Sequence, residues 1–272
     1  MLFQRFITAL LLAPLTVAII LLLPTPWLAA VGAVVFLGAL EEWARLAGVR
    51  QAAMRIALLA AAVVLFWLLW SVHAGLPGTL LLALGVAWWA LACLWLRHFA
   101  YGAAPTPENR ARKLLAGAFV MFPAWIAVIA LHGREPHGRW WMLLSLLIVW
   151  AADIGAYFSG RRFGRRKLAP QISPGKTRAG AYGALVAGTL VCLLGGWLLG
   201  VRGVTLAGLA VLAVLTVATS IVGDLLESLM KRHAQVKDSG NIFPGHGGLL
   251  DRLDSVFAAL PVFALGLWLL GL

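Results

Sequence analysis

The sequence predicts an all-α fold, a polytopic integral membrane helical bundle of about nine transmembrane helices, on three observations. Hydrophobic residues make up 62% of the 272-residue chain and charged residues only 12%, whereas soluble domains carry about 25% charged residues. Apolar runs close to the roughly 20 residues that a helix needs to cross a bilayer recur along the chain. Strand-like alternation is absent, and lipid offers backbone groups no partner, so we expect helices rather than a barrel.

Nine apolar segments, separated by basic, Gly-rich or Pro-rich connections, are expected to form these helices. The first is longer than the ~7–15-residue core of a secretory signal, and it runs through Pro24-Thr25-Pro26 directly into the second. We therefore interpret it as a helix of the mature protein. Short turns at 73–78 and 200–203 follow the third and seventh segments. The nine segments are 7–23, 27–40, 56–72, 79–96, 114–131, 140–158, 181–199, 204–222 and 256–270.

Two connections, 160–180 and 223–255, are longer than the rest and carry half of the charged residues. We expect one membrane domain overall. In it, residues 1–130 form N-terminal transmembrane helices, and residues 131–272 form C-terminal transmembrane helices that carry these two loops.

The net charge of +12 could suggest a nucleic-acid partner, but the distribution of the charge argues against one. If the N-terminus is cytoplasmic, 19 of the 22 Lys and Arg residues fall on the inside, and only Arg134, Arg139 and Arg202 fall outside. The positive-inside rule predicts this asymmetry. The same cations would attract anionic head groups of membrane lipids and nucleotide phosphates. We therefore expect a multi-pass protein of the cell inner membrane, with its long polar loops in the cytoplasm.

The acidic residues concentrate in one of these loops, since five of the ten lie within 224–254. Asp224, Glu227, Ser228 and Lys231 are spaced i, i+3, i+4 and i+7, so they share one face of a helix that continues the eighth span. A solvated helix end with a Glu227–Lys231 pair is the simplest interpretation of these four residues alone. Carboxylates interleaved with Lys and Arg suit Mg²⁺ bound to a polyphosphate instead.

Two turns with little side-chain bulk follow, at 237–240 and 244–248. Glycines such as Gly247 and Gly248 let backbone N–H groups approach a phosphate and form an anion nest. His246, between glycines, could bind metal or phosphate, or it could make a structural hydrogen bond. Asp251 and Asp254 then lie at i and i+3 at the start of the last helix.

Asp153 and the segment Ser173-Pro174-Gly175-Lys176-Thr177 are the remaining candidates. A carboxylate at membrane depth costs roughly 2.5–3.5 kcal/mol and therefore usually marks function, although Asp153 could instead pair with Arg161 or Arg162. The segment 173–177 lacks the P-loop pattern. Its Ser, Lys and Thr precede a helix whose N-terminus could hold a phosphate.

The segment 228–254, SLMKRHAQVKDSGNIFPGHGGLLDRLD, resembles the signature of the phosphatidate cytidylyltransferase (CDP-diglyceride synthase) family, bacterial type. The segments DIGAY (153–157), GRRFG (160–164) and SPGKT (173–177) are similar to its other cytoplasmic motifs. Arg178 and Ala179 depart from the family, which commonly has an aromatic residue and then Glu or Gln there, so we assign no role to Ala179.

The resemblance implies an Mg²⁺-dependent nucleotidyltransferase of phospholipid biosynthesis, which converts CTP and phosphatidate into CDP-diacylglycerol and pyrophosphate. It also implies a possible homodimer. The acceptor phosphate is already anionic, so catalysis should rest on positioning and charge neutralisation.

The resemblance further implies roles for individual residues. Asp224 and Asp251 are the first choices as metal ligands. Asp238 and Asp254 are second choices, as ligands or as groups that orient Lys237 and Arg252. The side chains expected to hold CTP phosphates are those of Lys231, Arg232, Lys237 and Arg252. Those expected to hold the lipid phosphate or the nucleotide are Ser173, Lys176 and Thr177.

Two other functions fit parts of the pattern. A CTP-dependent polyprenol kinase would need a base for a hydroxyl acceptor, and Asp238 could serve. A transporter would place its charges near the membrane midplane, often in repeats, whereas the acids here crowd one face.

Overall fold

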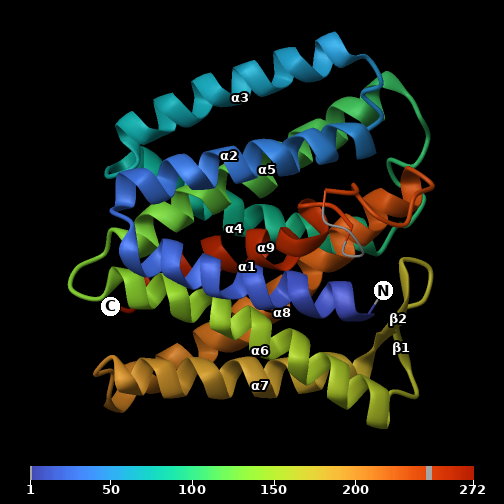
Figure 1. Ribbon diagram of the computed structural model, residues 1–272. Helices are drawn as coiled ribbons and strands as arrows, with labels where there is room; N and C mark the ends of the chain where they lie inside the picture. The colour runs from blue at the N-terminus through green and yellow to red at the C-terminus, as the bar shows by residue number, and fades with distance from the viewer. Residues whose placement is uncertain (1, 243–246) are drawn as a thin grey trace.

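The computed structural model describes residues 2–242 and 247–272, with side chains from residue 10 onward. Within these residues the chain forms nine α-helices and one β-hairpin (Figure 1). Each of the nine expected segments corresponds to one helix, so the predicted all-α class is confirmed. The helices are α1 (Leu2–Leu22), α2 (Thr25–Leu46), α3 (Ala52–Val72), α4 (Leu76–Leu96), α5 (Pro107–His132), α6 (Gly138–Phe163), α7 (Arg178–Leu198), α8 (Gly203–His233) and α9 (Leu250–Leu269).

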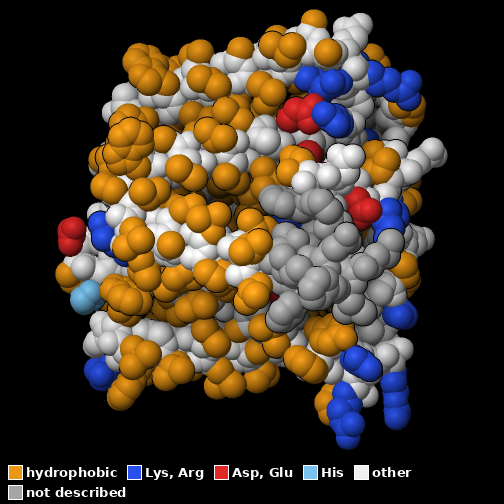
Figure 2. Space-filling model, viewed as in Figure 1, with side chains coloured by type: hydrophobic (Ala, Val, Ile, Leu, Met, Phe, Trp, Pro, Cys, Tyr) orange, Lys and Arg blue, Asp and Glu red, His pale blue; other side chains and the backbone are white. Residues whose placement is uncertain are grey.

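The eight helices from α2 to α9 are long and apolar enough to cross a membrane, and in α1 the described apolar part is Leu10–Leu22. Large apolar side chains such as Trp67, Leu190 and Val211 are exposed on the outside of the bundle. Apolar side chains cover most of the face shown in Figure 2. In water this surface would be unfavourable, whereas in a bilayer it faces acyl chains. The chain is therefore a multi-pass membrane protein.

The interior of the bundle is built around α5 and α9. Met121 and Leu131 of α5 and Phe257 and Phe263 of α9 are fully buried. The helices α6 and α7 meet through small residues: a Cβ placed on Gly155 would lie 2.5 Å from the carbonyl oxygen of Gly183. Close packing through glycine is the usual way for membrane helices to associate, since lipid supplies no hydrophobic driving force between them.

The β-hairpin was not predicted. Its strands β1 (Lys167–Ala169) and β2 (Ser173–Thr177) pair antiparallel, with Lys167 opposite Thr177 and Ala169 opposite Ser173. Strands this short show no readable alternation of polar and apolar residues. The hairpin fills the connection between α6 and α7.

The β-hairpin marks one end of the bundle, which we call the hairpin end. Because successive helices run in opposite directions (Figure 1), α6 and α8 finish at this end, and α7 and α9 begin there. Most Lys and Arg side chains visible in Figure 2 also gather at this end. The two long polar connections of the sequence therefore meet on one side of the molecule.

Candidate active site

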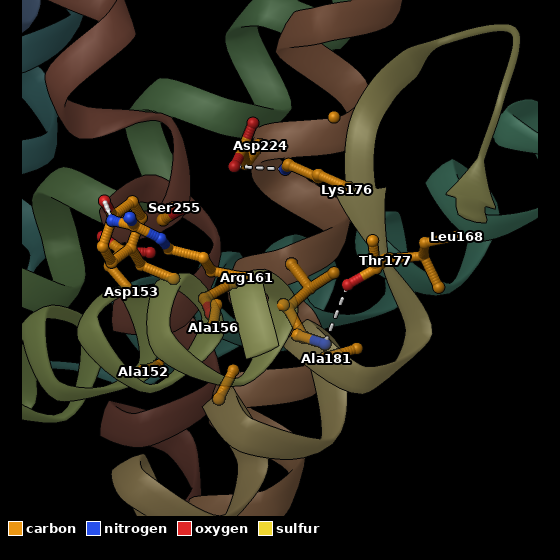
Figure 3. Close-up of a pocket in the computed structure, with 17 residues that line it drawn as sticks. Ala152, Asp153, Ala156, Arg161, Leu168, Lys176, Thr177, Ala181, Asp224 and Ser255 are labelled. Carbon is orange, nitrogen blue, oxygen red and sulfur yellow. Dashed lines mark hydrogen bonds and ion pairs between the residues drawn. The ribbon is translucent and has the colours of Figure 1, made fainter. Parts of the chain in front are cut away.

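A cavity of about 370 Å³ lies at the hairpin end, between α6, the hairpin, α7, α8 and α9 (Figure 3). Its walls contain many small residues, and its polar side chains come from four elements: α6, β2, α8 and α9. The polar side chains that line it are those of Asp153, Tyr157, Arg161, Lys176, Thr177, Ser220, Asp224 and Ser255.

Three predicted residues bring their charges together in this cavity. Lys176 of β2 forms an ion pair with Asp224 of α8 (Figure 3). Asp153 of α6 is exposed to the cavity and lies within electrostatic reach of Asp224, Lys176 and Arg252. Within the described residues Asp153 forms no ion pair, and Arg161 donates instead to the Tyr157 hydroxyl at 3.1 Å. The geometry thus favours a role for Asp153 in the cavity over a structural pair with arginine.

Asp224 also belongs to a cluster of three carboxylates. One oxygen each of Asp224, Glu227 and Asp254 lies within 4.8 Å of the other two, a spacing that could hold a metal ion. Glu227 is only 2% exposed, and its Oε1 has no hydrogen-bond partner among the described residues. A buried carboxylate oxygen without a donor is costly unless a cation or a water meets it. This orphaned oxygen is therefore a reason to place a cation beside the cluster.

The solvated helix end considered from the sequence is wrong. The expected pair of Glu227 and Lys231 does form, with Lys231 Nζ 2.9 Å from Glu227 Oε2, but both side chains lie inside the bundle. Ser228 is also buried, and its hydroxyl donates to Asp224 Oδ1 at 3.5 Å. The shared helix face points at the neighbouring α9 rather than at solvent.

Asp251, predicted as a metal ligand beside Asp224, lies in a second network. Its Oδ1 accepts from Lys231 Nζ at 2.5 Å. Its Oδ2 accepts from the Ser239 backbone N–H at 2.9 Å, the Ser239 hydroxyl at 2.9 Å and the Gly248 N–H at 2.8 Å. Lys231 joins the two networks, because it also contacts Glu227.

Gly247 and Gly248, the described part of the Gly-rich turn, lie against carboxylates of the chain itself. The Gly248 N–H donates to Asp251, and the N–H groups of Leu249 and Leu250 donate to Glu42 of α2. Gly247 has φ +81°, and a Cβ there would lie 2.5 Å from Asp251 Oδ2. The glycines therefore make room for these carboxylates, while binding of a substrate phosphate by Gly247 and Gly248 stays a prediction. His246 lies outside the described residues.

The remaining predicted residues surround the cavity at different distances from its charges. Thr177 lines the cavity, and its hydroxyl oxygen accepts from the Gly180 N–H at 3.1 Å, which caps α7. Arg232 Nε donates to the Ile172 carbonyl at 3.2 Å and so ties α8 to the hairpin. Ser173 lies at the start of β2, outside the cavity lining. Three further predicted residues are exposed and form no side-chain hydrogen bond among the described residues: Lys237, Asp238 and Arg252.

Sequence reasoning gave no site role to two carboxylates, Glu227 and Glu42. Glu227 is spaced i, i+3 from Asp224, and that spacing alone could have placed it in the same cluster. Glu42 directly follows a long apolar segment, and an acid at such a position is a functional candidate. Its contacts with residues about two hundred positions later have no sequence signal.

Comparison with known proteins gives consistent matches over the whole chain. The model of the cytidylyltransferase family matches residues 3–270. The chain is 44% identical to a phosphatidate cytidylyltransferase of Pseudomonas aeruginosa, over 100% of this chain and 98% of that protein. It is 37% identical to one of Haemophilus influenzae, over 97% of this chain and 98% of that protein. A third, from Brucella suis, is 43% identical over 53% of each chain.

Proposed function

The chain belongs to the cytidylyltransferase family, and from this premise we propose that it is a phosphatidate cytidylyltransferase. It would transfer CMP from CTP to phosphatidate and release pyrophosphate. The observation that carries the proposal, beside the full-length similarity, is the cavity at the hairpin end. In its wall, between membrane helices, Lys176 of β2 pairs with Asp224, one of the three clustered carboxylates.

In the proposed reaction, a phosphate oxygen of phosphatidate attacks the α-phosphorus of CTP. The new P–O bond forms as the bond between the α-phosphorus and the bridging oxygen to the β-phosphate breaks, and pyrophosphate leaves with that oxygen. The attacking oxygen is already anionic, so no general base is required. The protein has to align the two phosphates and offset their repulsion.

Lys176 is the cation best placed for this work. In the structure its ammonium group pairs with Asp224 at the cavity wall, and we propose that it turns to a substrate phosphate when one enters. Arg252 is exposed on the first turn of α9. It would neutralise the negative charge of the leaving pyrophosphate. Apolar lining residues such as Ala156, Ala184 and Ile221 give the cavity a wall against which a lipid can lie.

We further propose that the enzyme uses Mg²⁺. The three clustered carboxylates, with the Glu227 Oε1 that has no hydrogen-bond partner among the described residues, suit a hard divalent cation. Such a cation prefers oxygen ligands. Asp224, Glu227 and Asp254 would hold the ion. Asp251, expected as a ligand from the resemblance, would first have to release its donors on Ser239 and Gly248. When bound, Mg²⁺ would neutralise charge on the phosphates.

The test of this proposal uses purified protein in detergent with CTP, Mg²⁺ and short-chain phosphatidate. We expect lipid-linked cytidine and pyrophosphate in equal amounts, and loss of both products when EDTA removes the metal. CTP consumption with a lipid alcohol, giving CDP without pyrophosphate, would favour a polyprenol kinase instead. Turnover that is unaffected by EDTA would contradict the metal requirement while leaving the transferase activity in place.

We also propose where the protein lies in the cell and how many copies assemble. Basic residues gather at the hairpin end (Figure 2). By the positive-inside rule, this distribution supports an inner-membrane protein whose active site faces the cytoplasm. The resemblance to the bacterial enzymes also leads us to propose a homodimer. The mass of the detergent-solubilised protein, measured by light scattering after gel filtration, checks the dimer.

A further inference from the structure

Glu42 of α2 is a buried carboxylate outside the cavity, and both of its oxygens accept hydrogen bonds. It is 2% exposed. Its Oε1 accepts from the Leu249 N–H at 2.9 Å, and its Oε2 accepts from the Leu250 N–H at 2.8 Å and from the Ser239 hydroxyl at 2.7 Å. All three donors lie about two hundred residues later in the chain, in the segment 228–254.

These bonds supply a cap that α9 lacks in its own sequence. The residue at the N-cap position is Leu249, which has no side-chain capping bond. The first N–H groups of a helix have no partner within the helix, and burying them unpaired is unfavourable. Glu42 satisfies two of them from another helix, and its negative charge faces the positive end of the α9 dipole.

The loop before α9 is shaped around the same carboxylate. A Cβ on Gly240 would overlap Glu42 Oε1, and a Cβ on Gly248 would overlap Glu42 Oε2 and the Ser239 hydroxyl. Two glycines of the motif are therefore required for Glu42 to reach its donors. The N–H groups of Leu249 and Leu250 therefore already bind an anionic group, the carboxylate of Glu42.

A continuous set of contacts connects Glu42 with the carboxylate cluster. Ser239 donates its hydroxyl to Glu42 and its backbone N–H to Asp251. Asp251 accepts from Lys231, and Lys231 contacts Glu227. One turn after Asp251, the same helix carries Asp254 of the cluster and Ser255 of the cavity wall. The position of the first turn of α9 therefore decides where these groups lie.

We infer that Glu42 is a positioning residue for the reaction: from the N-terminal half of the chain, its carboxylate holds Ser239 and the start of α9 so that Asp251 and Asp254 meet α8. This inference rests on the proposed function for its kinetic consequence. Glu42 touches neither the cavity nor the cluster, so it acts through the residues that it holds.

The experiment compares Glu42→Gln with Glu41→Gln in the purified full-length protein. Glutamine keeps the size of the side chain but turns an NH₂ group toward N–H or O–H donors. The control removes the charge of the neighbouring residue on the same helix, which forms surface pairs with Arg45 at 2.7 Å and Arg55 at 3.2 Å. The readouts are kcat, KM for CTP, the melting temperature and hydrogen exchange measured by mass spectrometry.

We expect Glu42→Gln to lower kcat about 100-fold, since small misplacements of reacting groups have effects of this size, and to leave KM for CTP nearly unchanged. Hydrogen exchange should become faster at Leu249, Leu250 and the rest of the first turn of α9, and should stay unchanged in α5. Glu41→Gln should behave as the unmodified protein does in all four measurements.

Unchanged kcat and exchange in Glu42→Gln would overturn the inference. If the variant melts earlier, kcat is measured at a temperature where it is fully folded. A normal kcat there would reduce Glu42 to a stability residue and also overturn the inference, whereas a reduced kcat supports it. If the unmodified protein does not turn over CTP and phosphatidate, the proposed function fails. The exchange comparison at Leu249 and Leu250 then still decides whether Glu42 holds α9.

Discussion

At the scale of single residues, the buried carboxylates at the hairpin end are distinguished by what donates to them. Asp251 receives three N–H or N⁺–H donors and a share of the Ser239 hydroxyl. A hydroxyl carries one hydrogen, so Ser239 can donate to Asp251 or to Glu42, but not to both at once. Glu227 has Lys231 on one oxygen and no described partner on the other. The satisfied carboxylates hold the loop, and the unsatisfied one faces the site.

We predict that Asp251→Asn lowers turnover by about 100-fold or more, since charge-assisted hydrogen bonds are worth about 1.5–3 kcal/mol each and several are lost together. The amide nitrogen of asparagine would face donors on Ser239, Gly248 or Lys231. The measurement is the initial rate of lipid-linked cytidine formation per amount of membrane-inserted protein.

Glu135→Gln is the control for this substitution, because Glu135 is an exposed carboxylate in the α5–α6 connection at the opposite end of the bundle. It should retain the full rate. An active Asp251→Asn protein would contradict both a metal-ligand role and a need for these hydrogen bonds in turnover.

At the scale of elements, two helices start with the same capping device in different surroundings. Thr177 caps α7 by accepting from the Gly180 N–H at 3.1 Å, and Thr106 caps α5 by accepting from the Asn109 N–H at 3.3 Å. Thr177 lines the cavity, whereas Thr106 does not. The pair therefore separates the stability that a cap contributes from any part in the chemistry.

We predict that Thr177→Ala and Thr106→Ala each lower the free energy of unfolding by about 1 kcal/mol, the usual value of a threonine cap. Only Thr177→Ala should also reduce turnover, since its hydroxyl lies at the cavity. Thr177→Ser, which keeps the hydroxyl, should restore both properties. Thermal unfolding in detergent and the cytidylyl-transfer assay check the three variants. Equal turnover in the two alanine variants would limit Thr177 to capping.

Elements differ in how far the sequence could predict them. The nine helices are readable because each needs a long apolar run, and the face shared by Asp224, Glu227, Ser228 and Lys231 follows from helical spacing alone. The hairpin is not readable, because strands of three and five residues leave no period to detect. The contacts of Glu42 with α9 depend on how α2 packs against a distant loop, which no local pattern encodes.

At the scale of the whole molecule, the charge distribution and the site share one end. The opposite end carries the basic residues Arg134, Arg139 and Arg202, while the hairpin end carries most of the others. A membrane potential that is negative inside favours retention of cations on the inner side by about 2.3 kcal/mol per charge for 100 mV. On two grounds, the charge distribution and the proposed use of CTP, we expect one orientation.

We predict that the hairpin end faces the cytoplasm, and cysteine labelling in whole cells checks the orientation. Cys93 is exposed and Cys192 is buried, so Cys93→Ala provides a background with little reaction of its own. In that background, His137→Cys lies in the α5–α6 connection and Arg165→Cys lies beside the hairpin, both at exposed positions. A membrane-impermeant maleimide should label His137→Cys in intact cells, and should label Arg165→Cys only after the inner membrane is permeabilised.

The reverse pattern would place the cavity on the outer face, where CTP is absent, and would contradict the proposed function along with the orientation. Equal labelling of both positions in intact cells would contradict the antiparallel alternation of the helices, on which the two-ended distribution of charge depends.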